Sequence, residues 1–290
     1  MEAEGEEGSE KGNWRARYSP LPALPPQGWE EGQGEEGIQM YKLVWAEEFD
    51  KPGPPDPKNW TFEHGFVRNE EHQFYQEANA WCEKGNLIIE ARRERVKNPA
   101  FKPGSKNWRE SREFAEITSS SLSTSGLQSW QYGRFEMRAK IDTQLGLWPA
   151  FWTLGVEGEW PSNGEIDIME FYRGKLLANV AWGTKQRWNA KWDSTKTPLE
   201  SLGKDWTKKF HTWRMDWDET AIELSVDGRL LNRTELATAT NPDGKCPFKQ
   251  PHYILVNLSV GGQNGGDFSK TVFPTRYEID YIRVYQKNGI

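Results

Sequence analysis

The sequence predicts an all-β fold, a β-sandwich, and three observations support that prediction. Short apolar segments recur along the chain, Gly, Asn and Pro separate them, and helical periodicity is weak throughout. The 290 residues fit one large β domain, and 36% hydrophobic residues are enough for a sizeable core. We find neither an internal repeat nor a second domain.

Several segments have the composition and alternation of strands. The clearest is 133–141, in which Phe135 and Met137 fall on one face and Arg134 and Glu136 on the other. The full set of expected strands is 42–49, 85–91, 133–141, 147–155, 164–171, 175–183, 210–217, 221–232, 252–262 and 276–286. Within 221–232 the pair Asp227-Gly228 lies between apolar runs and predicts a tight hairpin.

The N-terminal region differs from the rest of the chain. Residues 1–40 are rich in Glu, Gly and Pro and hold nine Glu against three Lys or Arg, which accounts for the net charge of −6. Such a segment cannot bury enough apolar surface to fold alone, so we expect a flexible tail followed by a domain over 41–290. The domain has 34 acidic and 34 basic residues. This balance argues against a nucleic-acid or membrane partner and suits an uncharged ligand.

The Trp and Cys contents narrow the possible classes of protein further. Sixteen Trp are more than a core needs, so some are expected to be exposed as stacking platforms. Cys82 and Cys246 lie far apart in sequence, which leaves both a disulfide and two free thiols open. Neither zinc-site spacing nor a membrane-length apolar run is present. The acidic segment after Met1 lacks the apolar core of a signal peptide, which leaves open a secretion signal removed before this sequence begins.

The segment 164–171, GEIDIMEF, carries three carboxylates among strand-forming residues. Residues two apart in a strand share a face, so Glu165 and Asp167 point the same way. Strict alternation would place Glu170 on the apolar side. One extra residue near Met169, a β-bulge, would return Glu170 to the acidic face.

Three carboxylates on one face share protons, because like charges raise one another's pKa values. Retaining glycoside hydrolysis uses such a pair, one as the nucleophile and one as the acid, roughly 5–5.5 Å apart. Glu165 and Glu170 are candidates for that pair, and Asp167 for the group that orients Glu165. A calcium site built from the three acids is the alternative, and a solvated edge strand is disfavoured by the apolar neighbours.

The segment WPSNGEIDIMEF resembles the bulged active-site signature of glycoside hydrolase family 16. It follows GLWPAFWTLG and precedes IDYIRVY, and the resemblance extends over about 43–286. It implies a jelly-roll β-sandwich of two antiparallel sheets with a concave substrate cleft. It also implies that Glu165 is the nucleophile, Asp167 the assisting acid and Glu170 the general acid/base. The family includes laminarinases, mixed-linkage β-glucanases, agarases, porphyranases and κ-carrageenases.

The segment LWPAFWTLG places Trp148 and Trp152 on one strand face with the small Ala150 between them. Sugar rings present C–H faces that stack on aromatic rings. If the segment stood alone, both Trp residues would be expected to pack in a core. The resemblance places Trp148 in the cleft and leaves both the cleft and the core open for Trp152. Trp160 resembles a family Trp that stacks on the sugar on the nucleophile side.

Further substrate contacts follow from the resemblance. Asn69, in VRNEEHQFY, matches a polar sugar contact of laminarinases, whereas Arg68 departs from the usual Asn. Ala181 stands where laminarinases have a substrate-contacting His, and Trp182 is expected to stack on sugar instead. The insert 185–206 adds three more Trp residues and is expected to shape one end of the cleft.

The resemblance also implies a structural cation. Glu48, Gly85 and Asp280 are similar to three positions that hold calcium on the convex face of many family members, where carboxylate and backbone oxygens suit a hard cation. No cofactor is expected for catalysis.

We therefore predict a secreted or periplasmic, monomeric endo-acting hydrolase that cleaves a β-linked polysaccharide with retention. An endo-1,3(4)-β-glucanase is the first expectation. A galactanase of the same family, cleaving agar, porphyran, carrageenan or mucin glycans, is the alternative, and Arg68, Arg173 and Arg187 could make a local basic groove for it. A non-catalytic, lectin-like module is the rival of another class, and a transglycosylase would use the same site.

Overall fold

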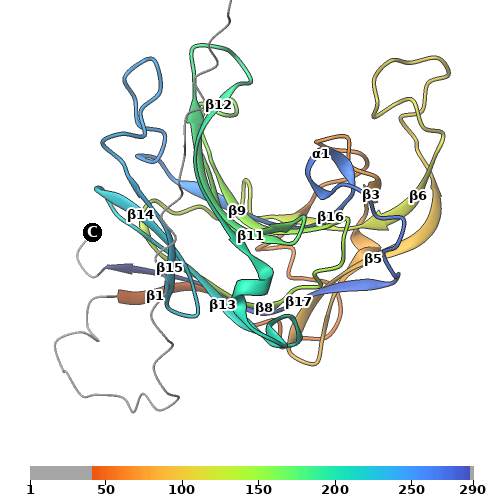
Figure 1. Cartoon of the computed structure of the whole chain (residues 1–290), viewed down its shortest axis with the longest axis horizontal. Helices are drawn as coiled ribbons and strands as arrows, with labels where there is room; N and C mark the ends of the chain where they lie inside the picture. The colour runs from red at the N-terminus through yellow and green to blue at the C-terminus, as the bar shows by residue number, and fades with distance from the viewer. Residues whose placement is uncertain (1–40, 288–290) are drawn as a thin grey trace, which may run out of the picture. The chain divides into compact units, whose positions relative to one another are not determined.

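Two packed β-sheets make up the computed structural model, which describes residues 41–287. The prediction of a flexible tail over 1–40 lies outside the described residues. Figure 1 shows the layers edge-on: β9, β11 and β16 belong to the upper sheet and β8, β13 and β17 to the lower one. The jelly-roll sandwich of two sheets expected from the sequence is confirmed.

The cleft sheet, as we call the upper layer, has seven antiparallel strands. In spatial order they are β12 (Ala190–Pro198), β11 (Lys175–Gly183), β10 (Glu165–Tyr172), β9 (Leu147–Gly155), β16 (His252–Val260), β7 (Ser121–Ser123) and β2 (Thr61–Phe62). The order is far from the chain order because β16, from the C-terminal part, inserts between β9 and β7. Strands distant in sequence therefore build one continuous floor.

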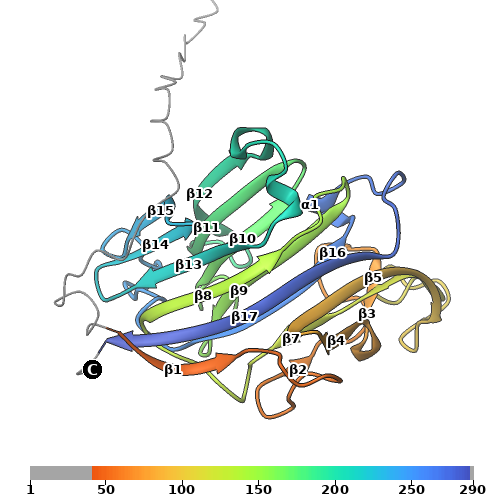
Figure 2. The same ribbon diagram turned by 90° about the horizontal axis from the view of Figure 1, so that it is seen from below.

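The back sheet has ten strands, and Figure 2 shows it from below. Its main path is β15 (Arg229–Glu235), β14 (Ala221–Val226), β13 (His211–Trp217), β8 (Gly133–Lys140), β17 (Thr275–Lys287), β5 (Asn86–Lys97), β6 (Phe114–Ser119) and β3 (Gln73–Tyr75). Two more strands lie off this path: β1 (Tyr41–Glu47) pairs with β17, and β4 (Ala80–Glu83) pairs with β5. The pairing of β3 with β6 is parallel.

The core fills the space between the sheets. In β8 the predicted alternation is observed: Phe135 and Met137 are fully buried, whereas Arg134 and Glu136 are only half-buried. On the outer face Arg134 pairs with Asp216 of β13 at 2.7 Å. The apolar side of β8 thus faces the cleft sheet, and an ion pair joins β8 to β13 on the outer face of the back sheet.

Turns and helices play a small part. Asp227 and Gly228 connect β14 to β15, and both have positive φ (49° and 76°), as the predicted tight hairpin requires. The described helical segments are α1 (Gly262–Gly265) and three short 3₁₀ turns, Glu77–Asn79, Leu199–Leu202 and Trp206–Lys208. No helix within 41–287 has the length and hydropathy to cross a membrane. Cys82 and Cys246 are both free thiols.

Candidate active site

The predicted β-bulge is present in β10. Against β9, Asp167 is opposite Trp152 and Met169 is opposite Phe151, so Ile168 has no partner and the register shifts there. Ile168 and Met169 are both fully buried in the core. Two consecutive residues therefore point inward, and the next one, Glu170, returns to the face that carries Glu165 and Asp167.

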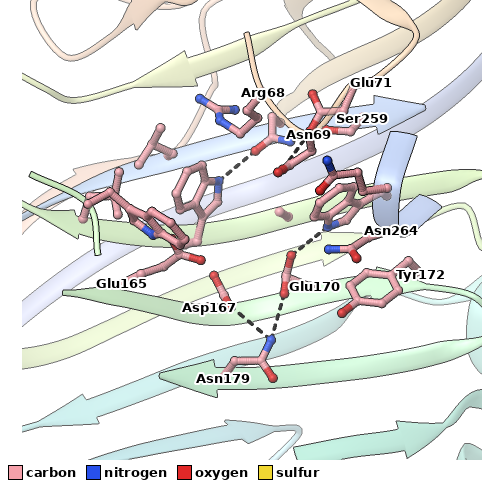
Figure 3. A pocket seen from close by; sticks show the side chains of 18 of the residues that line it. Arg68, Asn69, Glu71, Glu165, Asp167, Glu170, Tyr172, Asn179, Ser259 and Asn264 are labelled. Atoms are coloured by element: carbon pink, nitrogen blue, oxygen red, sulfur yellow. Dashed lines mark hydrogen bonds between the residues drawn. The ribbon is translucent and has the colours of Figure 1, made fainter. Parts of the chain in front are cut away.

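These three acids lie at the centre of a cleft with a volume of about 880 Å³. Its floor is formed by β9, β10, β11, β12 and β16, and residues 63–71 line one side. Figure 3 shows Glu165, Asp167 and Glu170 in a row along one strand, with Asn179 of the neighbouring strand beside them. The cleft is large enough for a chain of sugar rings.

Two of the predicted aromatic residues bind the acids directly. Trp148 Nε1 donates to Oε1 of Glu170 at 2.7 Å, and Trp160 Nε1 donates to Oε2 of Glu165 at 2.6 Å. Both tryptophans line the cleft. An N–H donor favours the ionised form of a carboxylate, so each indole orients one acid and offsets part of the effect of its burial.

Asn179, on β11, links the other two acids and was missed by the sequence reasoning. Its Nδ2 donates to Asp167 Oδ2 at 3.1 Å and to Glu170 Oε2 at 2.8 Å. Asn179 lies opposite Asp167 in the β10–β11 register. The available signal was a buried-strand pattern, KLLANVAWG, interrupted by one polar residue.

Burial dominates the electrostatics of the three acids. Burial and the nearby Glu170 carboxylate raise the pKa of Glu165 to about 7. Burial, followed by Glu170 and Glu165, raises the pKa of Asp167 well above its ordinary value. Burial also raises the pKa of Glu170, although the bond from Trp148 opposes this. The trio therefore retains a proton near neutral pH, as an acid catalyst requires.

The side of the cleft beyond β9 contains the other predicted contacts. Trp152 lines the cleft, and its Nε1 donates to Oδ1 of Asn257 at 2.8 Å. The Arg68 guanidinium lies 5.1 Å from the Trp152 ring centre and forms an ion pair with Glu63. Asn69 also lines the cleft. Trp152 is only 8% exposed, so it lines the cleft with most of its ring covered, in part by the Arg68 guanidinium.

The loop that carries Asn69 is held by its backbone. Asn69 has a left-handed φ of 53°, a conformation that Asn tolerates better than most residues, and its carbonyl accepts the Gln263 N–H at 2.9 Å. Glu71, in the same loop, is a further buried acid that the sequence reasoning did not select, and Gln73 Nε2 donates to it at 2.6 Å. Figure 3 places Glu71 and Asn69 across the cleft from Asp167.

The prediction that Trp182 stacks on sugar is wrong. Trp182 is only 3% exposed and packs in the core against Phe248, with a ring separation of 6.5 Å. Alternation explains this placement, because Asn179 and Ala181 point into the cleft side and the intervening and following residues, Val180 and Trp182, point to the core.

The insert 185–206 does shape one end of the cleft. Trp188 and Trp192 line it, and both are exposed. Trp206 instead belongs to the core, stacked on His211 at 3.8 Å.

The predicted calcium ligands do not fit a cation site. Both carboxylate oxygens of Glu48 accept hydrogen bonds from Arg283, at 2.7 and 2.8 Å. Asp280 is paired with Arg138. Within 41–287 no three His, Cys, Asp or Glu side chains are grouped as metal ligands. Guanidinium groups thus already neutralise the charges that a cation would need.

Comparison with known proteins agrees with this geometry. The sequence model of the family glycosyl hydrolases family 16 matches residues 69–283 of this chain. A β-glucanase from Rhodothermus marinus is 35% identical over 269 residues, which cover 85% of this chain and 85% of that protein.

Two solved structures are also similar. The laminarinase catalytic domain from Thermotoga maritima has a TM-score of 0.70 and 32% identity, over 85% of this chain and 98% of that one. A structure from work on endo-acting O-glycanases, which prominent members of the human gut microbiota express to initiate mucin breakdown, has a TM-score of 0.79 and 30% identity. It covers 87% of this chain and 92% of that one.

Proposed function

Since the chain belongs to glycosyl hydrolase family 16, we propose that it is a retaining endo-hydrolase of β-linked glucans, an endo-1,3(4)-β-glucanase. One observation carries the proposal: the bulge in β10 places Glu165, Asp167 and Glu170 on a single face, and all three line one cleft. Glycoside hydrolysis with retention needs two carboxyl groups on either side of the scissile bond.

In the first step Glu165 attacks the anomeric carbon, and Glu170 protonates the departing glycosidic oxygen. Burial raises the pKa of Glu170, which favours the protonated form that this step uses. The indole N–H of Trp160 supports the ionised form of Glu165 that attacks. The product is a covalent glycosyl-enzyme and a shortened leaving chain.

In the second step the roles of Glu170 reverse. It now accepts a proton from water, the water oxygen attacks the anomeric carbon, and the bond to Glu165 breaks. Trp148 and Asn179 both donate to the Glu170 carboxylate, so they support its ionised form in this half of the cycle. Asp167 lies between the two glutamates along β10 and is suited to pass or hold the shared proton.

A β-galactoside of the mucin type is the second candidate substrate. The observation that favours it is the TM-score of 0.79 with the structure from the O-glycanase work, against 0.70 for the laminarinase domain. Ala181 in place of the His of laminarinases supports the same alternative. A binding module without catalysis is disfavoured, because it would not need three buried acids.

The test is a product assay. The protein is incubated with laminarin, barley β-glucan, lichenan, agarose, porphyran, carrageenan and mucin glycans, and the released oligosaccharides are resolved. Internal cleavage of a glucan supports the proposal, and products from a galactan alone would replace the substrate. Glu165→Gln is the control, and we expect it to release nothing. If the wild type released nothing while remaining folded, the hydrolase proposal would be rejected.

We further propose that the enzyme acts as a monomer outside the cytoplasm, in secreted or periplasmic form. Polysaccharides of this class are too large to enter cells readily, which supports this location. Fractionation of the producing cells and light scattering of the purified protein test the two statements, and a cytoplasmic or dimeric protein would contradict them.

A further inference from the structure

The strand β12 extends the cleft sheet beyond the acids. It pairs with β11 so that Trp192 lies opposite Ala181 and Ser194 lies opposite Asn179. Ala181 in turn lies opposite Glu165 on β10. One row across the sheet therefore runs from Glu165 through Ala181 to Trp192, with all three side chains on the same face.

Ala181, at the centre of this row, is fully buried and does not itself line the cleft. The cleft continues from the acids to β12 beside it, because Asn179 and Ser194, which lie opposite one another, both line it together with Trp192. A ligand in the cleft can therefore extend from the acids toward β12.

The two tryptophans of the insert are unusually exposed. Trp188 is 55% exposed and Trp192 is 45% exposed, and they are the only tryptophans among the exposed large hydrophobic residues within 41–287. Both line the cleft that holds the acids. Large rings exposed together in a cleft are typical of a binding surface rather than of a core.

The insert is also braced, so the rings are held in place. The Arg187 guanidinium makes two hydrogen bonds to the Glu159 carboxylate, at 2.9 and 2.8 Å. Glu159 precedes Trp160, so this pair joins the insert to the loop that contacts Glu165. Below the cleft, Asp193 accepts a hydrogen bond from Thr234 of β15 at 2.9 Å. A positioned platform loses less entropy on binding than a mobile one.

We propose that Trp192 and Trp188 form a sugar-binding subsite on the opposite side of the cleavage point from Trp152. β9, with Trp152, and β11 flank β10 on opposite sides, and β12 lies beyond β11. The ligand is a pyranose ring of the substrate chain, whose C–H face packs on the Trp192 ring, with Trp188 at the rim. Ser194 and Lys196, which line the same stretch of cleft, face its hydroxyl groups. This inference rests on the proposed function and assigns one of its subsites.

The first test measures binding without turnover. In the Glu165→Gln background, retention by laminarin in native affinity gels is compared for Trp192→Ala, Trp188→Ala and the double variant. We expect Trp192→Ala to bind about tenfold more weakly, as an aromatic contact of roughly 1.4 kcal/mol predicts, and the double variant more weakly still. Trp81→Ala is the matched control, because Trp81 is a half-buried Trp of the back sheet outside the cleft, and it should bind as the parent does.

The second test uses the active enzyme and chains of graded length. Trp192→Ala should lower kcat/KM about tenfold for laminari-oligosaccharides long enough to reach β12 and leave the shortest cleavable ones nearly unchanged. If laminarin is not cleaved, the polymer that the wild type does cleave replaces it in both tests.

Equal binding and an equal length dependence in Trp192→Ala, with cleavage intact, would overturn the subsite and leave the proposed function standing. Absence of cleavage of every polymer by the wild type would reject the function and this subsite with it. A loss for short and long chains alike would show that Trp192 acts on the acids, which also overturns the subsite.

Discussion

Trp148 Nε1 lies 2.7 Å from Oε1 of Glu170, so an aromatic residue expected to stack on sugar also donates a hydrogen bond to the general acid/base. A similar bond joins Trp160 to Glu165 at 2.6 Å. The cleft tryptophans therefore affect the protonation of the acids as well as contact with the substrate.

The first prediction concerns the pH dependence of Trp148→Phe, which keeps a ring but removes the N–H donor. Because that donor favours ionised Glu170, its loss raises the pKa of Glu170. A general acid works in its protonated form, so the alkaline limb of the kcat/KM profile should move to higher pH. Trp152→Phe is the control, since Trp152 donates to Asn257 instead. An unchanged alkaline limb in Trp148→Phe would contradict the role of this bond.

The second prediction concerns Asn179, which donates to both Asp167 and Glu170. Hydrogen bonds to charged groups contribute about 1.5–3 kcal/mol each, so Asn179→Ala should lower kcat by roughly ten- to a hundredfold with a smaller change in KM. Asn179→Asp keeps the shape of the side chain but adds a fourth carboxylate beside the three acids. The decrease in kcat of this variant should become larger as the pH rises. If Asn179→Ala raised KM and left kcat unchanged, Asn179 would contact only the substrate.

The third prediction separates the roles of the acids. Glu170→Ala should lower activity on polymer by about 10²–10⁴-fold, and azide should restore turnover of an activated aryl glycoside because it attacks the glycosyl-enzyme without a base. Asp167→Asn should be milder than Glu165→Gln or Glu170→Ala. Rescue of Glu165→Gln instead, or a larger effect of Asp167→Asn than of Glu165→Gln, would mean that the roles are misassigned.

The fourth prediction links the acids to stability. The pKa of Glu165 is raised by burial from 4.5 to about 7, so the unfolded state releases this proton first as pH rises. The contribution of neutral Glu165 to the free energy of unfolding is therefore fully present below about pH 4.5, and it is lost as the pH rises through 7. Glu165→Gln should therefore be more stable than the wild type at pH 8, by up to about 3 kcal/mol, and nearly equal at pH 4. Urea unfolding at the two pH values measures this, and a constant difference would contradict it.

The fifth prediction contrasts a buried and an exposed tryptophan. Trp182→Ala empties a core site and should lower the free energy of unfolding by about 3–5 kcal/mol. Trp192→Ala changes an exposed ring and should alter it by less than about 0.5 kcal/mol. Similar losses in both variants, measured by denaturant unfolding, would show that Trp192 packs like a core residue.

Local pattern was sufficient for much of the fold and for the acids. Alternation in 133–141 predicted which residues of β8 face the core. The Asp227-Gly228 pair predicted the hairpin between β14 and β15. Both features depend on nearest neighbours along the chain. The bulge was predictable as well, since Glu170 was out of step with Glu165 and Asp167 in a strand that otherwise alternates.

The side-chain contacts between strands were not predictable in the same way. Trp182 is the exception, because its parity within 175–183, which the sequence alone contains, directs it to the core, and the expectation that it stacks on sugar did not use that parity. Glu48 and Asp280 had the right chemistry for a cation, but Arg283 and Arg138 come from β17 and β8 to pair with them. Such pairings depend on which strands become neighbours.

The β-sandwich, the three acids and their common face could all be predicted from local patterns, namely recurring strands separated by turn residues and one extra residue within 164–171. Tertiary structure alone decided that Asn179 links two of the acids, that indole N–H groups reach Glu165 and Glu170, and that Trp192 faces Glu165 across Ala181. Each of those contacts joins different strands or loops, and their distances exist only once the sheet order and register are set.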